Sequence, residues 1–356
     1  MHRPFKPSSQ SAANNTQLAP PNNRINVWTI DDIENFEINP DLYVAGNGHI
    51  MKGKDRLHLI VGYAGVGKSR VANFLAYCGA TGRQWFDYEI KNEFKTLFIQ
   101  TENGRARLKH DYENLFDQVR DKVFFTDLPT GARFDAAWFR QDLKNIIQRE
   151  SIGVIIIDPW TNVAPDLNHK EYNRAVELVL DCMPEDDALC PAIVVVAHLR
   201  KPDPASKNKR GSELMHEVMG SQTLTSRSRF VLVMERANPR DPKDDRVIVT
   251  CAKNNDSLYA PRSCHRRGKV IFEEVSNYDW EQHDQSGAVG CPRQYALSDI
   301  VDLVEPSEQI SSAEWKQRAM DALGISSSRF YDFQREAVSM ERIQRVAKGL
   351  YKRPSD

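Results

Sequence analysis

The chain has 356 residues, 40% hydrophobic and 27% charged, enough to bury a full α/β core with a smaller domain beside it. Its 48 basic and 49 acidic residues nearly cancel, which excludes binding of nucleic acid through net charge alone. No apolar run approaches the roughly 18 residues of a membrane span, and the polar first segment lacks the apolar run of a secretory signal. We therefore expect a cytoplasmic protein whose six scattered cysteines are free thiols.

The chain begins with a polar segment, residues 1–27, that is rich in Ser, Asn, Pro and Gln and is predicted to be a disordered tail. An α/β domain is expected over residues 28–282. Short, continuously apolar runs predict strands that are buried on both faces, and amphipathic stretches between them predict helices, which together favour a mostly parallel sheet. The expected strands are 58–62, 96–100, 123–126, 154–158 and 192–198, and the expected helices are 69–80, 105–119, 136–149 and 171–182.

The pattern changes after residue 228. Three further strands, at 230–235, 246–253 and 269–275, follow one another without helices between them. The segments that separate them, 237–245 and 261–268, are rich in turn residues. This pattern predicts an antiparallel extension at one edge of the sheet.

A second domain is predicted after a linker at residues 283–294. Helical periodicity returns at 298–304, 312–323 and 327–338, and a basic strand–turn–strand at 342–353 closes the sequence. Three helices followed by a hairpin are typical of a winged helix-turn-helix, which we expect over residues 295–356.

The segment GYAGVGKS matches the phosphate-binding pattern G-x-x-x-x-G-K-[ST] and lies between an apolar strand and a helix. Its glycines let backbone N–H groups converge on a phosphate, and the following helix adds its positive end. Lys68 is expected to reach the β- and γ-phosphates of ATP, and the Ser69 hydroxyl to bind Mg²⁺. The predicted ATP contacts are Gly62, Tyr63, Ala64, Gly65, Val66, Gly67, Lys68 and Ser69.

Three polar residues stand at the ends of apolar strands, where open α/β sheets bind ligands. Asp158 is the predicted second magnesium ligand. Glu102 is the predicted general base, with a helix-capping glutamate as the alternative. It would lie beside the γ-phosphate if its strand neighbours the strand of the phosphate loop. His198 is the predicted γ-phosphate contact, with a purely structural strand-end histidine as the alternative.

These motifs together resemble the RecA-like ATPases, and within them the plasmid RepA-type hexameric helicases and their AAA-type relatives. The resemblance rests on GYAGVGKS, TLFIQTEN, VIIIDPW, VVVAHLRK and VIVTCAKNN, and covers about residues 28–275. It implies a RecA-like fold, ATP hydrolysis, and a homo-oligomeric ring, usually a hexamer, with ATP bound between subunits.

The resemblance also implies that a basic residue from a neighbouring subunit completes each site. Lys253 matches that position, and a solvated strand-end lysine is the alternative. Many relatives carry an arginine two residues further on, where this chain has Asn255. Arg227 or Arg229 is therefore a further candidate for neutralising the transition state.

Two basic regions are candidates for binding DNA, by contacts to its phosphates. In a RecA-like ring, the loop after the strand that ends at His198 would line a central channel and bind single-stranded DNA. In the second domain, the helix at 327–338 would enter a major groove, with Phe330 and Phe333 toward the core and Gln334 exposed; protein docking is the alternative role. The predicted DNA contacts are Lys201, Lys207, Lys209, Arg210, Arg329, Arg342, Arg345 and Lys348.

The sequence therefore predicts an ATP-hydrolysing, ring-forming DNA motor, such as a helicase or translocase in the replication of a mobile replicon. A DNA-binding regulator or loader without unwinding activity, and a non-catalytic protein whose assembly ATP controls, remain as alternatives. A small-molecule kinase is disfavoured because no acceptor-binding lid is evident.

Overall fold

The computed structural model describes residues 28–164, 169–184, 186, 189–200, 209–219, 222–239, 241, 243–285 and 297–354. The predicted tail at 1–27 and residues 286–294 of the predicted linker lie outside them. The chain forms two compact units, Met1–Pro40 and Asp41–Asp356. In the first, helix α1 (Ile30–Glu34) begins with a capping box, in which the Thr29 hydroxyl accepts from the Asp32 N–H and the Asp32 carboxylate accepts from the Thr29 N–H.

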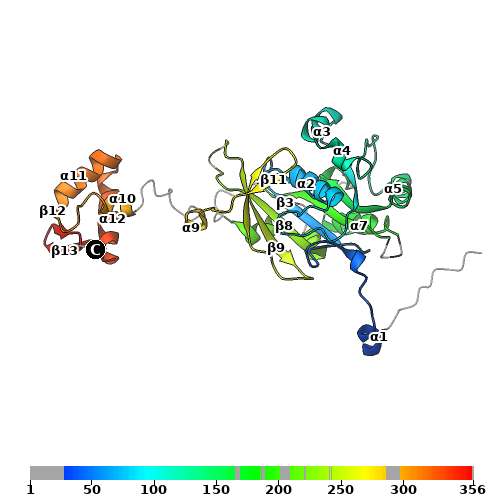
Figure 1. Cartoon of the computed structure of the whole chain (residues 1–356), viewed down its shortest axis with the longest axis horizontal. Helices are drawn as coiled ribbons and strands as arrows, with labels where there is room; N and C mark the ends of the chain where they lie inside the picture. Colours follow the sequence, from blue (N-terminus) through cyan, green and yellow to red (C-terminus); the bar gives the residue numbers. More distant parts are fainter. Residues whose placement is uncertain are drawn as a thin grey trace, which may run out of the picture. The chain divides into compact units, whose positions relative to one another are not determined.

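The second unit is built on a nine-stranded sheet in the order β11-β10-β9-β8-β3-β7-β6-β4-β5 (Figure 1). Strands β8, β3, β7, β6, β4 and β5 run parallel, and β9, β10 and β11 add antiparallel pairs at one edge. A separate pair joins β1 (Tyr43–Ala45) to β2 (Ile50–Met51). The strands of the large sheet are β3 (Leu57–Gly62), β4 (Lys95–Gln100), β5 (Val123–Phe125), β6 (Ile152–Asp158), β7 (Ala192–His198), β8 (Ser228–Arg236), β9 (Arg246–Asn254), β10 (Ser263–Arg267) and β11 (Phe272–Glu274).

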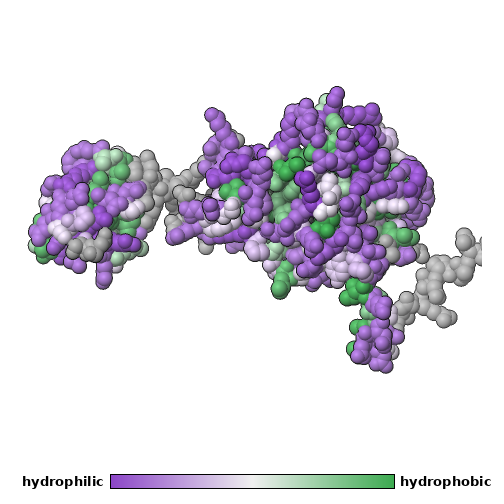
Figure 2. Space-filling model, viewed as in Figure 1, coloured by the Kyte–Doolittle hydropathy of each residue, from purple (hydrophilic) through white to green (hydrophobic). Residues whose placement is uncertain are grey.

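Helices cover both faces of this sheet, so the predicted α/β fold with a mostly parallel sheet is confirmed. No helix in the described part of the chain has the length and apolarity of a membrane span, and hydrophilic residues cover much of the face seen in Figure 2. The helices are η1 (Pro40–Leu42), α2 (Lys68–Thr81), α3 (Arg105–Asp111), α4 (Phe116–Val119), α5 (Ala137–Glu150), α6 (Trp160–Val163), α7 (His169–Leu180), η2 (Gly211–Glu217), α8 (Gln222–Arg227) and α9 (Trp280–Gln285).

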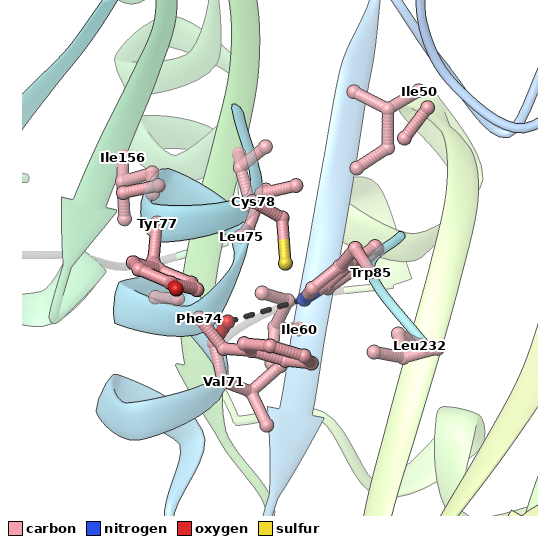
Figure 3. Close-up of a cluster of buried hydrophobic side chains, with 14 of the residues drawn as sticks. Ile50, Ile60, Val71, Phe74, Leu75, Tyr77, Cys78, Trp85, Ile156 and Leu232 are labelled. Atoms are coloured by element: carbon pink, nitrogen blue, oxygen red, sulfur yellow. Dashed lines mark hydrogen bonds between the residues drawn. The ribbon is translucent and has the colours of Figure 1, made fainter. Parts of the chain in front are cut away.

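The alternation of side chains along the strands divides the core into two layers. On one face, Ile60 and Ile156 pack with α2, whose Val71 carbonyl accepts a hydrogen bond of 3.3 Å from the Trp85 indole (Figure 3). On the other face, Ile155 and its neighbours pack with α5 and α7. Burial on both faces holds the ends of these strands in fixed positions.

Three details differ from the sequence prediction. Strand β8 pairs in parallel with β3, because α8 returns the chain before β8 begins; the antiparallel extension therefore starts at β9. The predicted helix at 105–119 is broken into α3 and α4, and Asn114 between them adopts a left-handed φ of 69°. The segment 261–268 was expected to be turn-rich, but it contains β10. The polar and charged residues of β10 lack the apolar pattern that predicts a strand.

The C-terminal residues, from α10 onward, pack around a hydrophobic core of their own. Trp315 is fully buried and its indole donates to the Ile300 carbonyl at 2.9 Å. Phe330 and Phe333 are buried as predicted, but Gln334 is also buried, because it bonds the Ser312 hydroxyl at 2.9 Å. The elements are α10 (Leu297–Val301), β12 (Gln309–Ser311), α11 (Ser312–Leu323), α12 (Ser327–Ser339), β13 (Gln344–Ala347) and β14 (Leu350–Lys352), with sheet order β12-β14-β13.

Candidate active site

The segment 62–69 turns sharply from buried β3 into α2. Gly65 and Gly67 adopt φ values of 73° and 106°, which side chains other than glycine rarely tolerate. Val66 between them is buried and anchors the loop to the core. The loop therefore has the backbone shape that directs N–H groups, together with the first turn of α2, toward an anion.

Lys68 is buried at the base of this loop. Its Nζ donates to the carbonyls of Gly62 at 2.9 Å and Tyr63 at 3.0 Å, and contacts His198 Nδ1 at 3.1 Å. Burial lowers the pKa of Lys68 to about 8, although Asp158 and Glu102 favour its charged form. An ammonium group only donates, so Nδ1 of His198 accepts and the proton of the neutral ring lies on Nε2. Burial and the charge of Lys68 lower the pKa of His198.

Asp158 ends β6 and is only 4% exposed. Burial raises the pKa of its carboxyl group to about 6, and a hydrogen bond from the Ser69 side chain opposes this shift. A carboxylate beside a hydroxyl supplies the hard oxygen ligands that Mg²⁺ prefers, so these two residues fit the predicted ion. No group of three or more His, Cys, Asp or Glu side chains within the described residues could hold a metal.

Glu102 follows β4, and the strand order corrects one expectation about it. Strands β6 and β7 lie between β4 and β3, so the strand of Glu102 does not neighbour the strand of the loop. The register aligns Gln100 with Asp158, which places residue 102 just beyond the end of β6. Glu102 is exposed, and its charge acts on Lys68, Asp158 and His198. The fold thus brings Lys68, Ser69, Glu102, Asp158 and His198 together at the carboxyl ends of four parallel strands.

The candidate trans-acting residues lie on β8, β9 and the helix before them. Lys253 donates to the carbonyls of Thr225 at 2.9 Å and Ser226 at 3.0 Å. Arg229 forms a two-point ion pair with Asp256, which also binds Arg56. Arg227 pairs with Glu177 at 3.2 Å. Both arginines are therefore already paired with carboxylates, whereas Lys253 contacts backbone oxygens.

The predicted DNA contacts are only partly described. Lys201 and Lys207 lie outside the described residues. Lys209 pairs with Glu217, and Arg210 donates to the His283 carbonyl at 2.6 Å, so both are engaged within the chain. Among the C-terminal residues, Arg342, Arg345 and Lys348 are exposed, and Arg329 is half-buried.

Two arginines beside the phosphate loop were missed in the sequence. Arg267 Nη1 donates to the Gly65 carbonyl at 2.9 Å, and Arg236 Nη2 lies 3.5 Å from the same oxygen. They come from β10 and β8, far from the loop in sequence. The only local signal was the basic pair Arg266–Arg267, within a segment read as a turn.

The chain was compared with known structures, curated proteins and family models. Among solved structures, the crystal structure of the RadB recombinase is similar, with 13% identity, coverage of 64% of this chain and 93% of that chain, and a TM-score of 0.42. No curated protein matches the chain. A family model described as "AAA domain" matches residues 19–204, over half of the chain, and this range contains Lys68, Glu102, Asp158 and His198. The chain therefore belongs to the AAA domain family.

Proposed function

We propose that this chain is an ATP-hydrolysing, ring-forming DNA motor with a RecA-like core and a C-terminal winged helix, acting as a RepA-like helicase or translocase of a mobile replicon. The observation that carries the proposal is the meeting of Lys68, Ser69, Asp158, Glu102 and His198 at one edge of the sheet. Phosphoryl transfer requires a cation, metal ligands and a carboxylate in such proximity.

In this proposal the loop amides and Lys68 bind the phosphates of ATP. Ser69 and Asp158 would hold Mg²⁺, which would neutralise charge that develops on the phosphate oxygens. Glu102 accepts a proton from the attacking water, and its exposed position gives that water access. His198, with its proton on Nε2, donates toward the γ-phosphate. His198 ends β7 directly before residues 199–210, which we call the basic loop. The contact of His198 with the γ-phosphate would therefore signal to the basic loop whether ATP or ADP is bound.

DNA binding would use two surfaces. The basic loop carries Lys201, Lys207, Lys209 and Arg210, and single-stranded DNA in a ring channel would compete with Glu217 for Lys209. The exposed Arg342, Arg345 and Lys348 of the β13–β14 hairpin, with Arg329 on α12, would contact duplex phosphates. The order of helices and strands in this domain supports its assignment as a winged helix.

The direct test is ATP hydrolysis by the full chain with and without single-stranded DNA, alongside its particle size and its ability to displace a DNA strand. We expect Mg²⁺-dependent hydrolysis, stimulation by DNA, a particle of about six subunits and strand displacement. Lys68→Ala is the control that should abolish hydrolysis. A monomer whose hydrolysis is indifferent to DNA would contradict the motor.

One observation favours a second candidate, a DNA-binding regulator or loader that hydrolyses ATP without unwinding DNA. Position 255 is Asn, and Arg227 and Arg229 are both paired with carboxylates of their own chain. Fewer cations are then available to complete a neighbour's site. DNA-stimulated hydrolysis without strand displacement would identify this function.

A further inference from the structure

Three arginines from separate elements meet beside the outer end of the phosphate loop. Arg70 lies in the first turn of α2, Arg236 ends β8 and Arg267 ends β10. Arg70 donates to the Gly268 carbonyl at 2.9 Å, and the other two approach the Gly65 carbonyl. We call these three residues the arginine cluster.

The positive charge of the arginine cluster is not compensated within the described residues. None of its members forms an ion pair there, and Arg267 Nε is buried without a hydrogen-bond partner. The carboxylates whose charge acts on Arg70 and Arg267 form their ion pairs elsewhere: Asp111 pairs with Arg107 at 2.7 Å, and Asp245 pairs with Arg266 at 2.9 Å. Burial lowers the pKa of Arg267, and the charges of Arg70 and Arg236 lower it further. Such a cluster is poised to bind an anion.

The position of the cluster on the loop indicates which anion. Lys68 Nζ lies at the carbonyls of Gly62 and Tyr63, where the loop begins, beside the magnesium ligands. Two members of the arginine cluster meet the loop at Gly65, before Lys68 in the chain, and Arg70 follows Ser69 in α2. A polyphosphate that has its terminal phosphate at Lys68 would reach the cluster by extending along the loop toward Gly65. The Arg267 side chain also runs against Gly67, where a Cβ would lie 2.7 Å from Arg267 Cδ.

We propose that the arginine cluster binds the third phosphate of the bound polyphosphate, the α-phosphate of ATP, and so extends the phosphate loop by a side-chain site from β8 and β10. This inference rests on the proposed binding of ATP at the loop. It assigns to Arg267 the main contact, because its Nη1 lies 2.9 Å from the Gly65 carbonyl, closer than Arg236 Nη2 at 3.5 Å. The competing explanation is that Arg267 and Arg236 only stabilise the loop, through their contacts with the Gly65 carbonyl.

The test compares three ligands that differ in length: ATP, inorganic tripolyphosphate and pyrophosphate. Pyrophosphate fills only the two positions nearest Lys68, whereas the other two extend to the cluster. Charge-assisted hydrogen bonds to phosphate are strong. Arg267→Gln should therefore weaken the binding of ATP and of tripolyphosphate by about tenfold or more, and the binding of pyrophosphate by less than about twofold. Dissociation constants are measured by competition with a fluorescent nucleotide.

Arg266→Gln is the matched control, because it removes the same charge from the adjacent residue of β10, which pairs with Asp245 instead. It should leave all three affinities within about twofold, since exposed ion pairs contribute little. Arg236→Gln is a second variant. The contact of Arg236 with the loop is weak, so we expect this variant to fold normally. It should weaken the binding of ATP and tripolyphosphate but not that of pyrophosphate.

The outcomes separate this inference from the proposed function. If Arg267→Gln and Arg236→Gln bind ATP as tightly as the unmodified chain, the inference is wrong. It is also wrong if their affinities for all three ligands fall by the same factor, because the arginine cluster then has only a structural role. If the unmodified chain itself binds no ATP, the proposed function fails first.

Discussion

His58 provides a sharp test of the sheet that supports the phosphate loop. It lies in β3, is 1% exposed, and its Nδ1–H donates to the Ile193 carbonyl at 3.0 Å while Nε2 accepts from the Met51 N–H at 3.2 Å. A second ring proton, on Nε2, would face the Met51 N–H, which is also a donor. Burial further disfavours the charged ring and lowers the pKa of His58 to about 4.

The sign of the pH effect follows from this arrangement. Unfolded His58 has a pKa of about 6.5, so the unfolded chain takes up its proton first as the pH falls. The contribution of the neutral ring to stability is complete above pH 6.5 and is lost between 6.5 and about 4. Between pH 7 and 5 the loss amounts to about 2 kcal/mol of the free energy of unfolding.

The assay is urea unfolding at pH 7 and pH 5, followed by tryptophan fluorescence, for the unmodified chain and for His58→Asn. Asparagine can still donate to Ile193 but does not titrate. We expect the variant to be less stable at pH 7, with a pH-dependent loss about 2 kcal/mol smaller than that of the unmodified chain. Other titrating groups, including buried His265 with its pKa lowered to about 4, contribute to both proteins equally. Equal pH slopes for the two proteins would refute the reasoning.

Gly79→Ala should lower the free energy of unfolding by about 1–2 kcal/mol, because its Cβ would overlap the buried Phe94 ring and the cost exceeds the helix-propensity gain of about 1 kcal/mol. Gly104→Ala is the comparison without overlap, with no atom within 4 Å of its Cβ; it lies at the N-cap of α3 and should cost less than about 1 kcal/mol, from capping alone, in the same urea experiment. Asp158→Asn should bind ATP normally in EDTA but lose Mg²⁺-dependent hydrolysis by at least about 100-fold; hydrolysis that still responds to Mg²⁺ would remove its role as a ligand. If Lys253 acts on a neighbouring subunit, Lys253→Ala and Glu102→Gln should each be inactive, while mixing them restores part of the rate; a mixture as inactive as its components contradicts action between subunits.

The sequence predicted the α/β fold because short, β-branched, continuously apolar runs such as 154–158 and 192–198 are typical of strands buried on both faces. It also predicted Lys68, Ser69 and Asp158 as site residues, because the spacing of the phosphate loop and a carboxylate at a strand end are local features. The structure brings these residues together with Glu102 and His198, and their roles stay predictions.

What the sequence could not provide depends on contacts between distant segments. The strand order, which separates β4 from β3 by two strands, is set by packing of crossover helices and leaves no local trace. Strand β10 has no apolar alternation, so Arg267 could not be placed beside Gly65. The burial of Gln334 likewise follows from its bond to Ser312, which is 22 residues away along the chain.

The most direct test of the central claim is single-turnover hydrolysis of Mg·ATP by Glu102→Gln, with nucleotide binding measured on the same protein. The amide keeps the size of the side chain but cannot accept a proton from water. We expect ATP affinity within about threefold of the unmodified chain and a hydrolysis rate lower by at least about 100-fold. A variant that binds and hydrolyses ATP at the unmodified rate would contradict the assignment of Glu102, and with it the mechanism proposed for this site.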